Sequence, residues 1–150
     1  MFLIKGQMFY KKCMYFCGFY KVVYVKIKQK KNEEKIIMPF ITTRTNTEIT
    51  KEQEFSIKEK LGEAISLLGK SESWLMLDFK DNCRLWFKGD NSKKIAFVEI
   101  ALFGKASPSQ YDAMTEKVCE IISEELGISS DCIYVKYEEV ENWGYNGFNF

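Results

Sequence analysis

The chain has 150 residues, 46% of them apolar and 29% charged, which is typical of one soluble globular domain with a sizeable core. Residues 1–38 hold nine Lys against two Glu, and residues 39–150 hold thirteen Lys or Arg against nineteen Asp or Glu, so the two parts carry net charges of about +7 and −6. The acidic part offers no broad basic surface to neutralise phosphates, which argues against nucleic-acid binding.

The chain contains five Cys and no His, which limits the chemistry that it can perform. Cys13 and Cys17 stand one residue too far apart for a C-x-x-C redox pair, and the other three cysteines lack the spacing of a metal site. We therefore expect reduced, mostly packed thiols, no metal and no cofactor. Without His, any acid–base catalysis must use another group whose pKa lies near neutrality.

Residues 1–38 are interpreted as a basic N-terminal extension to a domain formed by residues 39–150. Lysines interrupt each apolar run before it reaches the roughly 20 residues of a membrane helix, and no clean signal-peptide core is present. The interleaved basic and aromatic residues could lie on an anionic membrane surface. We favour a translated leader upstream of a true start at Met38, because the segment is rich in residues with A/T-rich codons. Removal of Met38 would then expose a prolyl amine at Pro39.

The first half of the domain predicts a strand, a helix and two more strands. Residues 39–45 are β-branched and begin with a proline, which the first position of a strand tolerates because it has no donor to lose. Thr50 and Gln53 have the spacing of a capping box, and an apolar stripe then continues to Gly69, which predicts a helix. The next strands are expected at residues 74–79 and 83–87.

The second half repeats the strand–helix–strand order. Residues 95–103 form the longest strand candidate in the domain. Ser107 and Gln110 form a second capping box, which starts a helix that should end at Gly127. Residues 132–137 are expected to form the last long strand.

Two segments of the domain are alike, because residues 68–79 align without a gap on residues 126–137, 58 positions later. The domain should therefore consist of two strand–helix–strand units. Because each crossover is right-handed, the units would form a four-stranded mixed sheet with both helices on one face, an α+β two-layer sandwich. Residues 95–103 are apolar on both sides apart from Glu99, so we expect a partner to cover the helix-free face, which predicts a homo-oligomer.

Residues 39–150 resemble the macrophage migration inhibitory factor and D-dopachrome tautomerase family along almost their whole length. The resemblance rests on short motifs in matching order: Met38-Pro39, Thr45-Asn46, Leu68-Gly69-Lys70, Phe87 with Gly89, Phe103-Gly104, Cys132-Ile133-Tyr134 and the closing stretch 142–150. It implies a tautomerase fold and a homotrimer whose sheets form a central barrel, with a site at each subunit interface. It also implies isomerase activity on phenylpyruvate-like and dopachrome-like substrates, small enolisable aromatic keto acids among them.

The resemblance assigns a role to several residues of this sequence. Pro39 matches the catalytic proline, whose secondary amine serves as the base, and Lys70 matches the lysine that binds substrate. Phe103 matches a position whose backbone contacts substrate, and Tyr134 matches a tyrosine supplied by the neighbouring subunit. The aromatic or apolar pocket positions are matched by Trp74, Tyr145 and Phe150.

Lys136 departs from the family pattern, because many members place there an Asn that hydrogen-bonds substrate. We expect Lys136 to bind substrate and to alter substrate preference through its charge, while a strand lysine can also serve only to discourage aggregation. The family's C-x-x-C pair is missing from residues 93–99, so no thiol redox activity is expected.

A second function stays open, namely a secreted cytokine-like protein that binds a receptor, with vestigial or no catalysis. The isomerase hypothesis requires Pro39 to be the mature N-terminus, since an amide nitrogen has no basic lone pair. We expect a cytoplasmic protein, or one secreted by a route independent of a signal peptide. Membrane contact is expected only if residues 1–38 are retained.

Overall fold

The computed structural model describes residues 2–4, 7–16, 19–26 and 38–149, and the chain divides into two units, Met1–Lys35 and Ile36–Phe150. In the first unit three antiparallel strands pair in chain order: β1 (Phe2–Ile4), β2 (Gln7–Phe16) and β3 (Phe19–Lys26). None of the helices in the described part of the chain is both long enough and apolar enough to span a bilayer.

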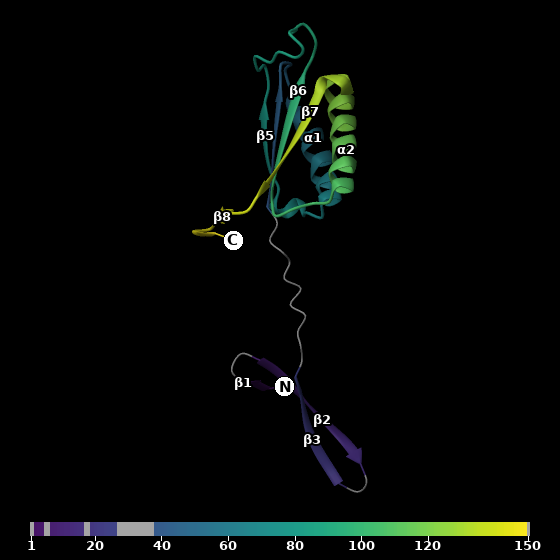
Figure 1. The fold of residues 1–150 in the computed structure, drawn as a ribbon, viewed down its shortest axis with the longest axis vertical. Helices are drawn as coiled ribbons and strands as arrows, with labels where there is room; N and C mark the ends of the chain where they lie inside the picture. Colours follow the sequence, from purple (N-terminus) through teal and green to yellow (C-terminus); the bar gives the residue numbers. More distant parts are fainter. Residues whose placement is uncertain (1, 5–6, 17–18, 27–37, 150) are drawn as a thin grey trace. The chain divides into compact units, whose positions relative to one another are not determined.

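The second unit is a four-stranded mixed sheet with two helices packed on one face (Figure 1). The sheet order is β5-β4-β6-β7, in which β4 pairs parallel with β5 and antiparallel with β6, and β6 pairs parallel with β7. The elements are β4 (Pro39–Thr45), α1 (Lys51–Ala64), β5 (Met76–Lys80), β6 (Ala96–Phe103), α2 (Pro108–Leu126) and β7 (Ile133–Val140). The predicted fold of two strand–helix–strand units is confirmed.

Both helices begin and end where the sequence predicts. Thr50 and Ser107 are the N-caps of α1 and α2, and each forms a complete capping box with the Gln three residues later. A 3₁₀ helix, η1 (Ile65–Leu68), continues α1 up to Gly69. Gly69 and Gly127 end the two helical stretches with φ values of 68° and 63°, a left-handed conformation that glycine adopts without a Cβ penalty.

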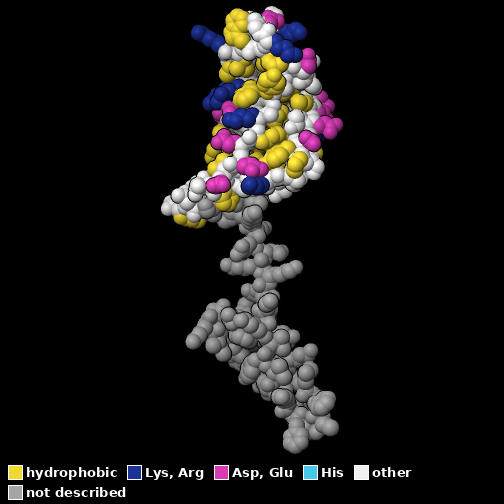
Figure 2. Space-filling model, viewed as in Figure 1, with side chains coloured by type: hydrophobic (Ala, Val, Ile, Leu, Met, Phe, Trp, Pro, Cys, Tyr) yellow, Lys and Arg dark blue, Asp and Glu magenta, His cyan; other side chains and the backbone are white. Residues whose placement is uncertain are grey.

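The hydrophobic core lies between the sheet and the helices. Ile41 and Ile100 contribute from the central strands, and Leu61 and Met114 from the helices, and all four side chains are fully buried. Acidic side chains lie along the helix side of the domain in Figure 2, where α2 exposes Asp112, Glu116, Glu120 and Glu124. The helices are thus amphipathic, with their apolar stripes against the sheet.

Truncation of a core leucine should lower the stability of the domain. Leu61→Ala is expected to lower the free energy of unfolding by about 2–5 kcal/mol, because it leaves a cavity at a fully buried position. Leu67→Ala, at a side chain that is 39% exposed, should cost less than about 1 kcal/mol. Urea denaturation monitored by Trp fluorescence measures both values, and equal losses would contradict this assignment of the core.

The prediction of a strand at residues 83–87 is wrong. Within the described residues, this segment has no neighbouring strand, and only an isolated bridge joins Phe87 to Asp90. Cys83 N instead donates to Thr45 O at 2.8 Å, and Leu85 N donates to Cys83 O at 3.0 Å. The strand expected at residues 74–79 also begins later, because Glu72–Trp74 forms a 3₁₀ helix, η2.

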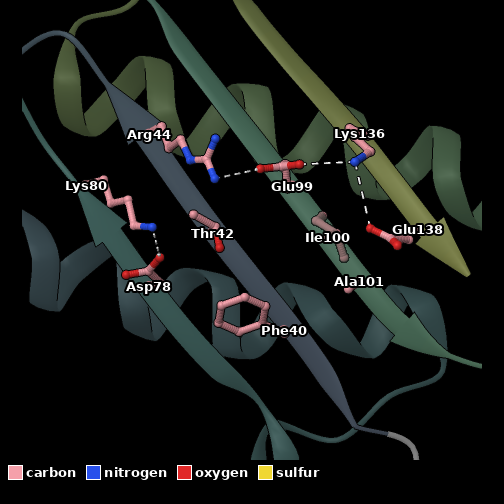
Figure 3. Close-up of a pocket in the computed structure, with 10 residues that line it drawn as sticks. All are labelled: Phe40, Thr42, Arg44, Asp78, Lys80, Glu99, Ile100, Ala101, Lys136 and Glu138. Carbon is pink, nitrogen blue, oxygen red and sulfur yellow. Dashed lines mark hydrogen bonds and ion pairs between the residues drawn. The ribbon is translucent and has the colours of Figure 1, made fainter. Parts of the chain in front are cut away.

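The helix-free face of the sheet differs from the apolar surface expected. Phe97 and Phe103 of β6 alternate with buried residues and lie on this face, as the sequence predicts, and Ala101 lies there with them. Charged side chains from the four strands, however, occupy its centre, among them Glu99 and Lys136 (Figure 3). Apolar area is therefore confined to parts of this face.

A short hairpin closes the described chain, formed by β8 (Gly144–Tyr145) and β9 (Phe148–Asn149). Its two-residue turn is Asn146–Gly147, in which both residues have positive φ values, 50° and 87°. Asn-Gly with this geometry is the preferred two-residue hairpin turn.

Candidate functional site

A pocket of about 510 Å³ opens at the edge of the sheet where β4 begins. Because β4 and β5 are parallel, their first residues meet at the same edge, and the hairpin of β8 lies beside them. The lining is mostly apolar and aromatic: Met38, Pro39, Phe40, Ser73, Trp74, Leu75, Met76, Trp143, Gly144 and Tyr145. Such a lining suits a flat apolar ligand.

Pro39 is the first residue of β4 and is buried at the wall of this pocket. It stands opposite Leu102 of β6 in the antiparallel register. The preceding carbonyl, Met38 O, accepts a hydrogen bond from Phe103 N at 3.3 Å, and Met38 itself is only 5% exposed. In the chain as it stands, the nitrogen of Pro39 is therefore an amide within a packed segment.

Lys70 is a buried cation, only 8% exposed, placed directly after the left-handed Gly69. Its Nζ donates to Phe103 O at 3.3 Å, and its backbone N donates to Ile65 O at 3.4 Å. Since Phe103 also bonds to the carbonyl before Pro39, these contacts bring Pro39, Lys70 and Phe103 together. Neither Lys70 nor Phe103 is among the residues that line the pocket, so the ammonium group lies beside Pro39 rather than in the pocket wall. A buried positive charge at this place favours a nearby anion.

Aromatic side chains form part of the pocket lining. Trp74 and Tyr145 meet edge to face, with ring centroids 5.3 Å apart and an interplanar angle of 90°. Trp143 and Met76 also line the pocket, although the sequence reasoning did not select them. Trp143 stands two residues before Tyr145 in the closing stretch. The turn at Asn146 predicts a hairpin there, and this signal could have indicated that both side chains lie at one site.

Two of the predicted site residues lie elsewhere on their own chain. Tyr134 and Lys136 of β7 stand opposite Phe97 and Glu99 of β6, six and four residues before Phe103. At the rise of a strand these separations are about 20 Å and 13 Å, so neither side chain reaches the pocket within one chain. Tyr134 is 58% exposed and packs edge to face on Phe87 at 5.0 Å. Phe150 lies outside the described residues.

Lys136 instead belongs to a charge network on the helix-free face (Figure 3). Its Nζ lies 3.1 Å from Glu99 Oε1 and 3.8 Å from Glu138 Oε2, and Arg44 Nη2 lies 3.3 Å from Glu99 Oε2. Asp78 and Lys80 of β5 form a further pair on this face, and the hollow between these side chains measures about 230 Å³. Three cations and three carboxylates balance one another, which makes this hollow a weaker candidate for ligand binding than the pocket at Pro39.

Comparison with known proteins matches residues 38–150 to the family model of macrophage migration inhibitory factor. The macrophage migration inhibitory factor of Xenopus laevis is 24% identical over 115 residues, which cover 75% of this chain and 99% of that protein. The crystal structure of Leishmania major MIF2 superposes with a TM-score of 0.71 at 30% identity, covering 75% of this chain and 97% of that one. A homologue from Prochlorococcus marinus gives a TM-score of 0.68 at 28% identity, covering 74% and 98%.

Proposed function

Because the chain belongs to the macrophage migration inhibitory factor family, we propose that it is a tautomerase that interconverts the keto and enol forms of phenylpyruvate-like and dopachrome-like substrates. Pro39 is the general base. Its neutral secondary amine takes a proton from the carbon next to the substrate's keto group, and negative charge develops on the keto oxygen. The protonated amine then returns the proton at the alternative position, so that the substrate is isomerised without a cofactor.

The observation that carries this proposal is the proximity of a buried cation to Pro39: Pro39 lines the aromatic pocket, and Lys70, which is not itself among the lining residues, is held at a neighbouring backbone carbonyl. Pro39 lies in the pocket wall, and the Nζ of Lys70 is held at Phe103 O, one residue beyond the partner of Pro39 in the sheet. Lys70 binds the substrate carboxylate and stabilises the enolate charge that develops during proton transfer. The rings of Trp74 and Tyr145 pack against the flat part of the substrate.

The reaction requires a free amine at Pro39. A free α-amine has a pKa near 8, and apolar surroundings with a nearby cation lower that pKa, so a useful fraction is neutral at physiological pH. An amide nitrogen after Met38 has no such lone pair. The decisive test compares keto–enol conversion by chains whose first residue is Pro39 or Met38.

A receptor-binding protein without catalysis is the second candidate. The observation that favours it is the packing of Met38, whose side chain is 5% exposed and whose carbonyl bonds to Phe103. If this segment stays attached to Pro39, the base is blocked and only the surface of the domain remains available for a cytokine-like role.

We also propose that the chain assembles as a homotrimer, in which Tyr134 and Lys136 of one subunit approach the pocket of the next. Residues 83–87, for which the described chain offers no partner strand, would supply part of the contact, and Trp86 in this segment is 67% exposed. Trp residues are common anchors of interfaces.

Light scattering should give a mass three times the 17.6 kDa of the chain. Trp86→Asp is expected to shift the protein toward smaller species, because it places a charge in the proposed contact. Phe55→Asp, at a side chain that is 61% exposed on α1, is the matched control and should leave the mass unchanged. A monodisperse wild-type monomer would refute the trimer.

A further inference from the structure

The two helices of the domain are joined at both ends by the same kind of contact. Gln53 and Gln110 are the third residues of α1 and α2, and their Oε1 atoms accept from the N-cap amides of Thr50 and Ser107 at 3.0 and 2.9 Å. The Nε2 atom of each glutamine crosses to the other helical stretch. Each capping box is therefore also a bridge between the helices.

These bridges end on equivalent carbonyl groups. Gln53 Nε2 donates to Glu125 O at 2.6 Å, and Gln110 Nε2 donates to Leu67 O at 3.1 Å. Leu67 and Glu125 each stand two residues before the left-handed glycine that ends a helical stretch. The last carbonyls of a helix lack partners within it, so an amide donor from the antiparallel neighbour satisfies one of them.

The C-terminal ends of the two helical stretches differ in the residue that follows the glycine. Ile128 follows Gly127 and is 1% exposed within the hydrophobic core. Lys70 follows Gly69, and its Nζ donates to Phe103 O, next to the bond from Phe103 N to the carbonyl before Pro39. The bridge from Gln110 therefore holds the chain three residues before Lys70, whereas the bridge from Gln53 holds the remote end of the helix pair.

We propose that Gln110 is a positioning residue of the site, which fixes the helix end from which Lys70 reaches Phe103. Gln110 does not contact the pocket and acts only through the backbone of Leu67. The hydrogen bond between α2 and η1 (Ile65–Leu68) limits rotation of the 3₁₀ turn and hence movement of the Lys70 ammonium group. This inference rests on the proposed function only for its kinetic consequence.

Gln110→Glu removes the bridging hydrogen bond to Leu67 O and keeps the capping hydrogen bond from Ser107 N. The Glu side chain still accepts from Ser107 N, as in the most common capping box, but it cannot donate to Leu67 O and its carboxylate repels that carbonyl. In the chain whose first residue is Pro39, we expect KM for phenylpyruvate to rise about threefold to tenfold, the range that corresponds to one net hydrogen bond, with kcat within about twofold of the unsubstituted chain.

Two variants control for a merely structural effect. Gln53→Glu makes the same chemical change at the remote end, where the bridge is shorter, and should lower the melting temperature without changing KM. Ser107→Ala removes the cap of α2 and keeps the bridge, so it should also leave KM unchanged. Equal rises in KM for Gln110→Glu and Gln53→Glu would overturn the proposal.

A measurement on the full chain keeps this inference independent of catalysis. Amide hydrogen exchange followed by NMR should show faster exchange at Lys70, whose N–H donates to Ile65 O, in Gln110→Glu than in Gln53→Glu. Unchanged exchange at Lys70 in Gln110→Glu would overturn the positioning role. Absence of turnover by the wild type with either Met1 or Pro39 as first residue would refute the tautomerase instead, and the exchange result would still decide the role of Gln110.

Discussion

A chain whose first residue is Pro39 should isomerise phenylpyruvate at least about a hundredfold faster than a chain whose first residue is Met38, since a positioned general base contributes about 10²–10⁴ in rate. The two proteins differ by one residue, and both retain the complete sheet and both helices. Only the first has a basic lone pair on the nitrogen of Pro39. Enol formation followed by ultraviolet absorbance measures the difference, provided that intact mass confirms each N-terminus.

The pH dependence of the Pro39 chain gives a second test of the same base. Activity should rise with pH as the prolyl amine loses its proton, with a midpoint below the value of about 8 for an unperturbed α-amine. A Pro39→Gly variant with the same N-terminus keeps an amine but loses the ring that fixes its direction, and we expect lower activity with an unchanged circular dichroism spectrum. Equal rates for the Met38 and Pro39 chains would rule out Pro39 as the base.

Local sequence signals were sufficient to predict the helix ends and the repeat. Thr50 and Ser107 with their glutamines, and Gly69 and Gly127, each act within one turn of helix, so their effect needs no knowledge of the rest of the chain. The four-stranded sheet with both helices on one face followed from the repeat and from the handedness of crossovers, whereas the order of the strands came from the structure. These features placed Lys70 at a helix end before the structure located its Nζ at Phe103.

Strand pairing was harder to predict, because it depends on neighbours that are distant in sequence. Residues 83–87 have the composition of a strand, but a strand needs a partner, and the described chain offers this segment none. The charge of Lys136 was visible in the sequence, whereas its pairing with Glu99 depends on the parallel register of β6 and β7. Trp143 was missed because its side chain reaches the pocket only through the path of the closing hairpin.

Lys70→Met should lower kcat/KM for phenylpyruvate roughly thirtyfold or more without destabilising the fold. Truncating one partner of a buried charge pair costs about 2–5 kcal/mol, and the substrate carboxylate would lose its buried cation. The Met side chain has a similar volume and no charge, so burial at this position, where Lys70 is 8% exposed, becomes less costly. Loss of the hydrogen bond to Phe103 O opposes this gain, so the free energy of unfolding should change by less than about 1 kcal/mol.

Lys94→Met is the matched control, because Lys94 Nζ also donates to a backbone carbonyl, Leu126 O, at 2.9 Å. Lys94 is exposed and its bond lies at the end of α2, so its loss should lower stability slightly and leave kcat/KM within about twofold. Loss of activity in Lys70→Met and loss of stability in Lys94→Met would show that Lys70 serves substrate binding, whereas Lys94 caps a helix. If Lys70→Met retained full kcat/KM, Lys70 would have only a structural role, and the carboxylate would have to bind elsewhere in the pocket.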